Sequence, residues 1–250
     1  MKILVLFGSK SDSFVSEPLV DELKKSFTVD FEVISAHRNP DRLHERLGQD
    51  DFHCIVAGAG LSAHLPGVCA SLTKKPVFGL PVTSQLGGMD SLMSIVQMPY
   101  GIPVGSLSPG NGLYLRSWLE DFLNTNVDLS APEINLVIDP KRENHEFYSK
   151  ELSRLNELMS EMNFKHTTSA KVDETKLNIQ MLAGFDTERI INTKFSVNNF
   201  ILDTSEKATP QASLKYFSEM NKNEGVYCGI SNTRNSLLFW NKLIEVRRSL

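Results

Sequence analysis

Cysteine, excess charge and long apolar runs are all scarce in this sequence of 250 residues. Its three cysteines, Cys54, Cys69 and Cys228, match neither the spacing of a metal site nor a disulfide framework. Cys54 lies in an apolar, strand-like run and Cys69 in a helix-like one, so we expect both to be buried thiols. This cysteine usage predicts a cytoplasmic protein without a cysteine-bound metal.

The small net charge and the lack of a long apolar run exclude two further classes of protein. A formal net charge of −4 gives no electrostatic basis for binding nucleic acid or an anionic membrane. No apolar run approaches the roughly 20 residues that cross a bilayer. The apolar residues 2–7 lead directly into Gly8 and Ser9, so we expect a first strand there rather than a signal peptide.

Apolar strand-like segments alternate with helix-like segments through the first half of the chain. We expect strands at residues 2–7, 31–34, 54–57, 76–80 and 104–107, and helices at residues 13–25, 40–47, 65–72, 91–98 and 113–123. Asn39 and Pro40 suit the N-cap and first position of a helix. The alternation predicts an α/β fold, a three-layer αβα sandwich with a parallel sheet of flavodoxin-like or Rossmann-like type.

The second half of the sequence repeats features of the first. The pattern Gly-x3-Gly-x5-Asn-x-Leu occurs at residues 101–113 and again, without a gap, at residues 225–237. Three weaker matches keep the same order: residues 91–98 with 213–220, residues 34–37 with 168–171, and residues 3–6 with 134–138. We interpret this as a tandem repeat of one fold, with domains at residues 1–125 and 132–250. The alternative is that apolar strands and glycine turns recur in any α/β chain.

The two copies differ in their polar residues. In this alignment Lys171 stands opposite His37 and Val172 opposite Arg38, while residues 140–144 stand opposite residues 8–12. The glycine-rich segment 58–67 has no counterpart in the second copy. We therefore expect the second domain to be degenerate and non-catalytic.

Four polar segments follow expected strands in the first half: residues 8–12, 35–40, 58–67 and 90–99. Open α/β sheets form their small-molecule sites at such strand ends, so we expect these segments to converge on one crevice. Backbone amides and serine hydroxyls at residues 8–12 suit a phosphate, and Arg38 adds a fork of N–H donors.

The sequences of these segments, in this order, resemble the N5-carboxyaminoimidazole ribonucleotide (N5-CAIR) mutase family of purine biosynthesis, class I PurE, over residues 2–123. They read Gly-Ser-Lys-Ser-Asp, Ser-Ala-His-Arg-x-Pro, Ala-Gly-x3-Ala-His-Leu-Pro-Gly and Asp-Ser-Leu-x-Ser-Ile-Val-Gln-Met-Pro. The third is similar to the mutase branch rather than to the branch that carboxylates aminoimidazole ribonucleotide (AIR) with CO2. The resemblance implies an isomerase that moves a carboxylate from the exocyclic nitrogen to C4 of the imidazole, without metal or organic cofactor.

Decarboxylation followed by recarboxylation requires a proton to be donated and later removed, which suits a histidine. His37 is our candidate for this proton shuttle, and the resemblance implies that His64 shapes the carboxylate pocket. It also implies a ribonucleotide-binding set, in which Asp12 takes the ribose hydroxyls. The set is Ser9, Ser11, Asp12, Ser35, Arg38, Gly60 and Leu65. The remaining histidines, at positions 44, 53, 145 and 166, are expected to be ordinary core or surface residues.

Two features bear on activity and assembly. Residues 108–111 form a shorter segment than the family carries at this place. The resemblance also implies octamers of single domains, so a tandem chain predicts a homotetramer that fills eight domain positions. Two alternatives to the mutase stay open: a direct AIR carboxylase, and a non-catalytic ribonucleotide-binding scaffold.

Overall fold

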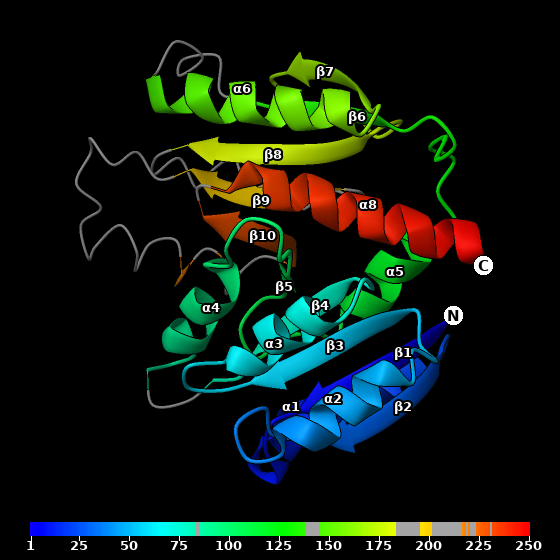
Figure 1. The fold of residues 1–250 in the computed structure, drawn as a ribbon, viewed down its shortest axis with the longest axis vertical. Coiled ribbons are helices and arrows are strands. Elements are labelled where there is room, and N and C mark those ends of the chain that lie inside the picture. The colour runs from blue at the N-terminus through cyan, green and yellow to red at the C-terminus, as the bar shows by residue number, and fades with distance from the viewer. Residues whose placement is uncertain are drawn as a thin grey trace.

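The computed structural model of the chain describes residues 1–83, 86–138, 146–183, 196–201, 217–218, 220, 224–230 and 232–250. Its strands form a single sheet flanked by helices (Figure 1), in the order β2-β1-β3-β4-β5-β10-β9-β8-β6-β7. The strands are β1 (Lys2–Phe7), β2 (Thr28–Val33), β3 (Cys54–Ala59), β4 (Val77–Pro81), β5 (Gly105–Ser106), β6 (Glu133–Val137), β7 (Lys165–Ser169), β8 (Leu177–Ala183), β9 (Ser196–Ile201) and β10 (Val226–Ile230). The α/β fold with a parallel sheet is confirmed.

The helices fall between the strands as the alternation predicts, although some ends differ. They are η1 (Lys10–Asp12), α1 (Ser13–Lys24), α2 (Pro40–Gly48), α3 (His64–Leu72), α4 (Met89–Val96), α5 (Leu115–Leu123), α6 (Glu146–Glu161) and α8 (Thr233–Ser249). Strand β2 begins three residues earlier than predicted because an edge strand is half exposed and carries polar residues such as Thr28. Helix α4 ends two residues early, since Pro99 disfavours a helical Met98.

The uninterrupted apolar run of β1 is buried on both faces of the sheet. Ile3, Val5 and Phe7 belong to one hydrophobic cluster, together with side chains of α1, α5, α6 and α8. Leu4 and Leu6 belong to the other, with side chains of α2, α3 and α4. Because successive strand residues point to opposite faces, this division shows the helix–sheet–helix layering directly.

The two halves of the sheet have the same strand order. Within the first half it is β2-β1-β3-β4-β5, and within the second it is β7-β6-β8-β9-β10. Neighbouring strands are parallel inside each half. The halves meet at β5 and β10, which are antiparallel and pair Ser106 with Tyr227. The sheet therefore continues across the middle of the molecule.

Aromatic side chains pack the junction between the halves. Trp118 of α5 and Trp240 of α8 stack with ring centroids 5.8 Å apart. Phe239 of α8 meets the ring of Phe78 edge-on at 5.2 Å. A side chain at position 105 would collide with Phe239, because a Cβ built there lies 2.4 Å from the ring, and this explains Gly105 in the repeated pattern. Helix α8 lies across β8, β9 and β10 (Figure 1).

An ion-pair network fixes α2 against the edge of the sheet. The guanidinium of Arg46 donates to Glu32 Oε1 at 2.7 Å, Asp51 Oδ1 at 2.8 Å and Asp30 Oδ2 at 3.1 Å. Lys2 Nζ also donates to Asp51 Oδ2 at 2.6 Å. Hydrogen bonds from Lys2 and then Arg46 lower the pKa of Asp51 to about 2. The network joins α2 to β2 and so fixes the positions of both ends of the loop between them.

Asp51→Asn should lower the free energy of unfolding in a pH-dependent way. The folded-state pKa is depressed, so the charge of Asp51 stabilises the fold above its ordinary value of 3.8, and this contribution is lost as the pH falls through about 2. We expect a loss below about 1 kcal/mol near neutrality, because the pair is partly solvated. Urea denaturation across a pH series measures it, with the exposed Asp21→Asn as control. A loss that persists undiminished at the acid end would contradict this role.

Candidate active site

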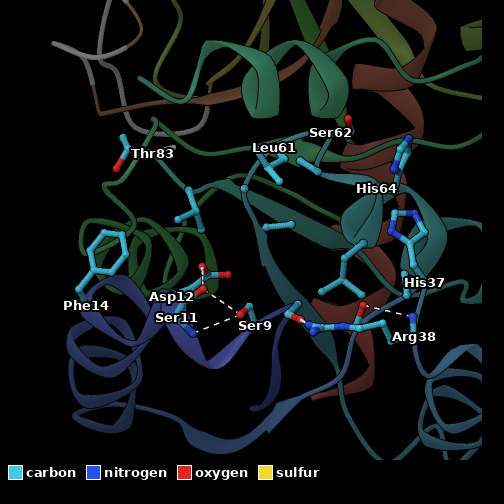
Figure 2. Close-up of a pocket in the computed structure, with 18 residues that line it drawn as sticks. Ser9, Ser11, Asp12, Phe14, His37, Arg38, Leu61, Ser62, His64 and Thr83 are labelled. Carbon is cyan, nitrogen blue, oxygen red and sulfur yellow. Dashed lines mark hydrogen bonds between the residues drawn. The ribbon is translucent and has the colours of Figure 1, made fainter. Parts of the chain in front are cut away.

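A cavity of about 780 Å³ opens where β1, β2, β3 and β4 end. The strand register makes these ends level: Phe7 pairs with Val33 and with Gly58, and Ala59 pairs with Pro81. The loops that follow β1, β2 and β3, together with Val82 and Thr83 after β4, line the cavity (Figure 2). This is the edge at which open α/β sheets bind small molecules.

The turn after β1 brings two hydroxyls and a carboxylate together. Ser9 is the N-cap of η1, and its Oγ accepts hydrogen bonds from the Ser11 backbone N–H at 3.2 Å and the Ser11 hydroxyl at 2.8 Å. Ser11 Oγ also lies 3.1 Å from Asp12 Oδ1. Burial raises the pKa of Asp12, while the hydrogen bond from Ser11 lowers it. The turn thus offers an acceptor for ligand hydroxyls and N–H groups for an anion.

The loop after β2 carries His37 and Arg38. It is closed by the Asn39 N–H, which donates to the Ser35 carbonyl at 2.9 Å, and by the Arg38 N–H, which donates to Ser35 Oγ at 3.3 Å. The Arg38 side chain crosses to the first loop, where Nη2 donates to the Gly8 carbonyl at 2.9 Å. A guanidinium has five N–H donors, so this bond holds Arg38 beside the serine turn and leaves donors for an anion.

The loop after β3 places a second histidine against the first. Leu61 and Ala63 have φ angles of +50° and +31°, in the left-handed region that costs about 1–2 kcal/mol for a residue with a side chain. This turn, closed by the Ala63 N–H on the Gly60 carbonyl at 3.1 Å, starts α3 at His64. The rings of His64 and His37 meet edge to face, with centroids 5.0 Å apart (Figure 2).

Every site residue predicted from the sequence lies on this one cavity. They are Ser9, Ser11, Asp12, Ser35, His37, Arg38, Gly60, His64 and Leu65. The structure brings them together; their individual roles stay predictions.

The expectation that residues 90–99 join the same crevice is wrong, because they are not among its described lining residues. Strand β4 ends at Pro81, whereas helix α4 begins only at Met89. Ser91 is fully buried, and its hydroxyl donates to the Val82 carbonyl at 2.9 Å and to the Gly88 carbonyl at 3.2 Å. This segment supports the turn after β4 instead of facing the cavity.

Phe14, Leu61 and Thr83 are among the lining residues that the sequence analysis did not single out. Phe14 and Leu61 lie at the cavity, and each is 60% exposed. Thr83 follows the end of β4 and could have been found from the rule that sites gather at strand ends. Phe14 lies outside the quoted motifs and Leu61 occupies a variable position within one, so the motifs mark neither as a site residue.

The short segment at residues 108–111 forms a tight turn behind Thr83. Ser108 bridges to Asn111, Gly110 has a φ of +67°, and the Gly110 N–H donates to the Pro81 carbonyl at 2.8 Å. A Cβ at Gly110 would lie 3.3 Å from Thr83 Cγ2, so this turn packs directly against the cavity wall.

The cysteines and the other described histidines lie away from this chemistry. Burial raises the pKa of Cys54 and Cys69 to about 12, and the expectation that both are buried is confirmed. His53 Nδ1 accepts a hydrogen bond from the Lys2 N–H at 3.0 Å, which is a structural contact. His145 lies outside the described residues. In the part of the chain that the structure describes, no cluster of three or more metal-binding side chains occurs, and no helix has the length and apolarity to span a membrane.

Comparison with known proteins places this region in a family. The family model of AIR carboxylase matches residues 2–113. The N5-CAIR mutase of Saccharolobus solfataricus is 46% identical to the chain over 116 residues, which make up 44% of this chain and 72% of that protein. The chain belongs to the AIR carboxylase family.

A second member, the N5-CAIR mutase of Haemophilus influenzae, is 49% identical over 116 residues, covering 44% of this chain and 70% of that protein. The crystal structure of Treponema denticola PurE matches with 20% identity and a TM-score of 0.44, over 64% of this chain and 98% of that chain. Every residue that lines the cavity falls within the part of the chain that the family model matches.

Proposed function

We propose that this chain is an N5-CAIR mutase, which converts N5-CAIR to 4-carboxy-5-aminoimidazole ribonucleotide in purine biosynthesis. The observation that carries the proposal is the His37–His64 pair, with ring centroids 5.0 Å apart in a cavity built from the family's segments. The relatives at 46% and 49% identity are named as mutases, which favours this reaction over direct carboxylation of AIR. The enzyme would act in the cytoplasm, without a metal or an organic cofactor.

The loops after β1 and β2 would hold the ribonucleotide. The amides and hydroxyls of the serine turn, with Arg38 fixed beside it through Gly8, form an anion site suited to the 5′-phosphate. The carboxylate of Asp12 accepts hydrogen bonds from the ribose hydroxyls, because its two oxygens carry several lone pairs. Bound in this way, the ribonucleotide directs its imidazole ring toward the two histidines.

The reaction then needs one proton and one trapped CO2. The carbamate C–N bond breaks and releases CO2, while the imidazolium of His37 donates a proton to the exocyclic nitrogen. Carbon C4 attacks the CO2, forming the new C–C bond, and the neutral imidazole of His37 removes the proton that C4 carried. His37 ends as it began, so the net change is an isomerisation. His64 walls the pocket in which the CO2 is held between the two steps.

His37→Asn should abolish turnover of N5-CAIR and leave ribonucleotide binding largely intact. The substitution removes the proton carrier but keeps the phosphate and ribose contacts, so kcat should fall by about 10²-fold or more. Steady-state kinetics and calorimetric binding measure the two effects, with the exposed α2 residue changed in His44→Asn as control. A variant at position 37 with near wild-type turnover would remove His37 from the mechanism.

Substrate choice separates the mutase from its alternatives. Purified chain should convert synthetic N5-CAIR and should be far slower with AIR and bicarbonate. Equal or faster turnover of AIR with bicarbonate would identify a direct carboxylase. Ribonucleotide binding without turnover of either substrate would identify a scaffold.

Arg38→Ala should act mainly on substrate binding. A charge-assisted hydrogen bond contributes about 1.5–3 kcal/mol, so the dissociation constant should rise by roughly 10- to 150-fold. Arg42→Ala is the matched control, since Arg42 lies one turn further on and pairs with Glu32 at 2.9 Å, away from the cavity. An unchanged dissociation constant would contradict the role of Arg38.

We infer further that the second half is a degenerate copy of the first. The shared strand order supports this inference. Hydrogen bonds also join the two halves at the junction of β5 and β10. The Tyr114 hydroxyl, near the start of α5, donates to the Gly225 carbonyl at 2.8 Å, and Asn235, near the start of α8, accepts from the Gly101 N–H at 3.1 Å. Lys171 aligns with His37 in the repeat. Its carbonyl accepts hydrogen bonds from Asn135 Nδ2 and Ser169 Oγ within the second half.

The exposed rim of the cavity supports an assembly of chains. Phe14 and Leu61 are each 60% exposed beside a polar site, where an isolated enzyme gains nothing from apolar side chains. We propose that other copies cover this rim in a homotetramer with closed symmetry.

Light scattering should give four times the chain mass of 28.0 kDa. Phe14→Glu with Leu61→Glu should shift the particle to a lower mass, because charge at a buried contact opposes association. A fully active monomer in the wild type would contradict the assembly; a dimer would contradict its tetrameric size.

A further inference from the structure

The start of α8, in the second half, holds a loop of the first half. The side-chain amide of Asn235 uses both of its ends on this loop: Oδ1 accepts from the Gly101 N–H at 3.1 Å, and Nδ2 donates to the Pro99 carbonyl at 3.0 Å. Asn235 is only 1% exposed, so its amide is shielded from solvent, although the loop residues that it binds lie at the surface. Buried, fully used amides fix the groups they bind, because each lost bond leaves an unsatisfied polar atom.

Two neighbours of Asn235 contact the same loop. Asn232 Nδ2 donates to the Met98 carbonyl at 3.3 Å. The guanidinium carbon of Arg234 lies 4.0 Å from the ring centroid of Tyr100, a cation–π contact. Residues 98–101 therefore all contact the start of α8, which lies more than a hundred residues further along the chain.

The held loop supports the wall that carries His64. The Met98 sulfur lies 3.0 Å from the position that a Cβ would take at Gly67, so Met98 rests on the first turn of α3. Met98 also packs on the hydrophobic cluster that includes Ala63 and Leu65. These two residues flank His64 in the sequence. A displacement of Met98 would therefore shift the start of α3 and, with it, the imidazole ring of His64.

We propose that Asn235 is a positioning residue, through which the second half fixes His64 against His37. It acts by way of the loop at residues 98–101 and α3, and it does not line the cavity. The effect on turnover rests on the proposed mutase function, whereas the effect on the imidazole does not. The second half thus has a role inside its own chain, beyond occupying a place in an assembly.

A residue on the same helix turn supplies the matched control. Thr233 is fully buried, and its hydroxyl donates to Glu151 Oε2 at 2.7 Å, a contact made within the second half. Thr233→Val therefore removes a buried hydrogen bond beside Asn235 without removing a side-chain hydrogen bond to the loop. A purely structural role would give Asn235→Ala and Thr233→Val the same consequences at the active site.

The experiment compares these two variants with the wild type in the full chain, at temperatures equally far below each melting temperature. Asn235→Ala should lower kcat by about 10- to 100-fold, as expected when a catalytic group shifts by up to about 1 Å, with KM changed less than about threefold. Thr233→Val should retain kcat. Equal losses of kcat in both variants, or a loss confined to KM, would overturn the proposal.

A second measurement separates this inference from the proposed function. Histidine ring signals are followed by NMR and assigned with His64→Gln and His53→Gln. Asn235→Ala should move the His64 signal and leave that of His53 unchanged, while Thr233→Val moves neither. If the wild type turns over neither substrate, the mutase function fails and this measurement alone decides the inference. An unmoved His64 signal in Asn235→Ala would overturn it in either case.

Discussion

The parallel register of β1 with its two neighbours is the constraint on which the site depends. Because Phe7 is level with both Val33 and Gly58, the loops after three strands leave the sheet at one height. The Gly8 N–H donates to the Gly58 carbonyl at 3.2 Å and the Ile34 N–H to the Phe7 carbonyl at 2.9 Å, which continues the pairing beyond the strand ends. A slip of one residue in either pair would turn one wall of the cavity away from the others.

The loops themselves are short and internally bonded, so the rigidity of the strands reaches the functional groups. Ser35 closes one loop through both its carbonyl and its hydroxyl, and Ser9 closes another through its hydroxyl. Ala63 stands in a conformation that costs free energy, which the packed strands and helices around it must offset. The site is thus organised before any ligand arrives, as catalysis by positioning requires.

The sequence predicted the local elements of the first half well, for reasons that can be named. Strands buried on both faces are continuous apolar runs, and glycine and proline mark the turns between them. All the site residues predicted from the motifs line the cavity, because the catalytic and binding residues of a family are concentrated in short segments of its sequence. Residues 90–99 were misplaced for the same reason: their motif suggested a site, whereas Ser91 serves the turn after β4.

Long-range features could not be predicted in this way. The union of the two half-sheets depends on a strand of two residues, β5, and on the single pair of Ser106 and Tyr227, which have no local signature. The hydrogen bonds of Asn235 with Pro99 and Gly101 join two segments that are far apart in the sequence, and no sequence pattern predicts that they meet. The antiparallel meeting of β5 and β10 also has a geometric consequence. Because the two strands run in opposite directions, the end of each lies beside the start of the other: Tyr114, after β5, donates to the Gly225 carbonyl before β10, and Asn235, after β10, accepts from the Gly101 N–H before β5. Hydrogen bonds therefore hold the junction at both ends of the short strand.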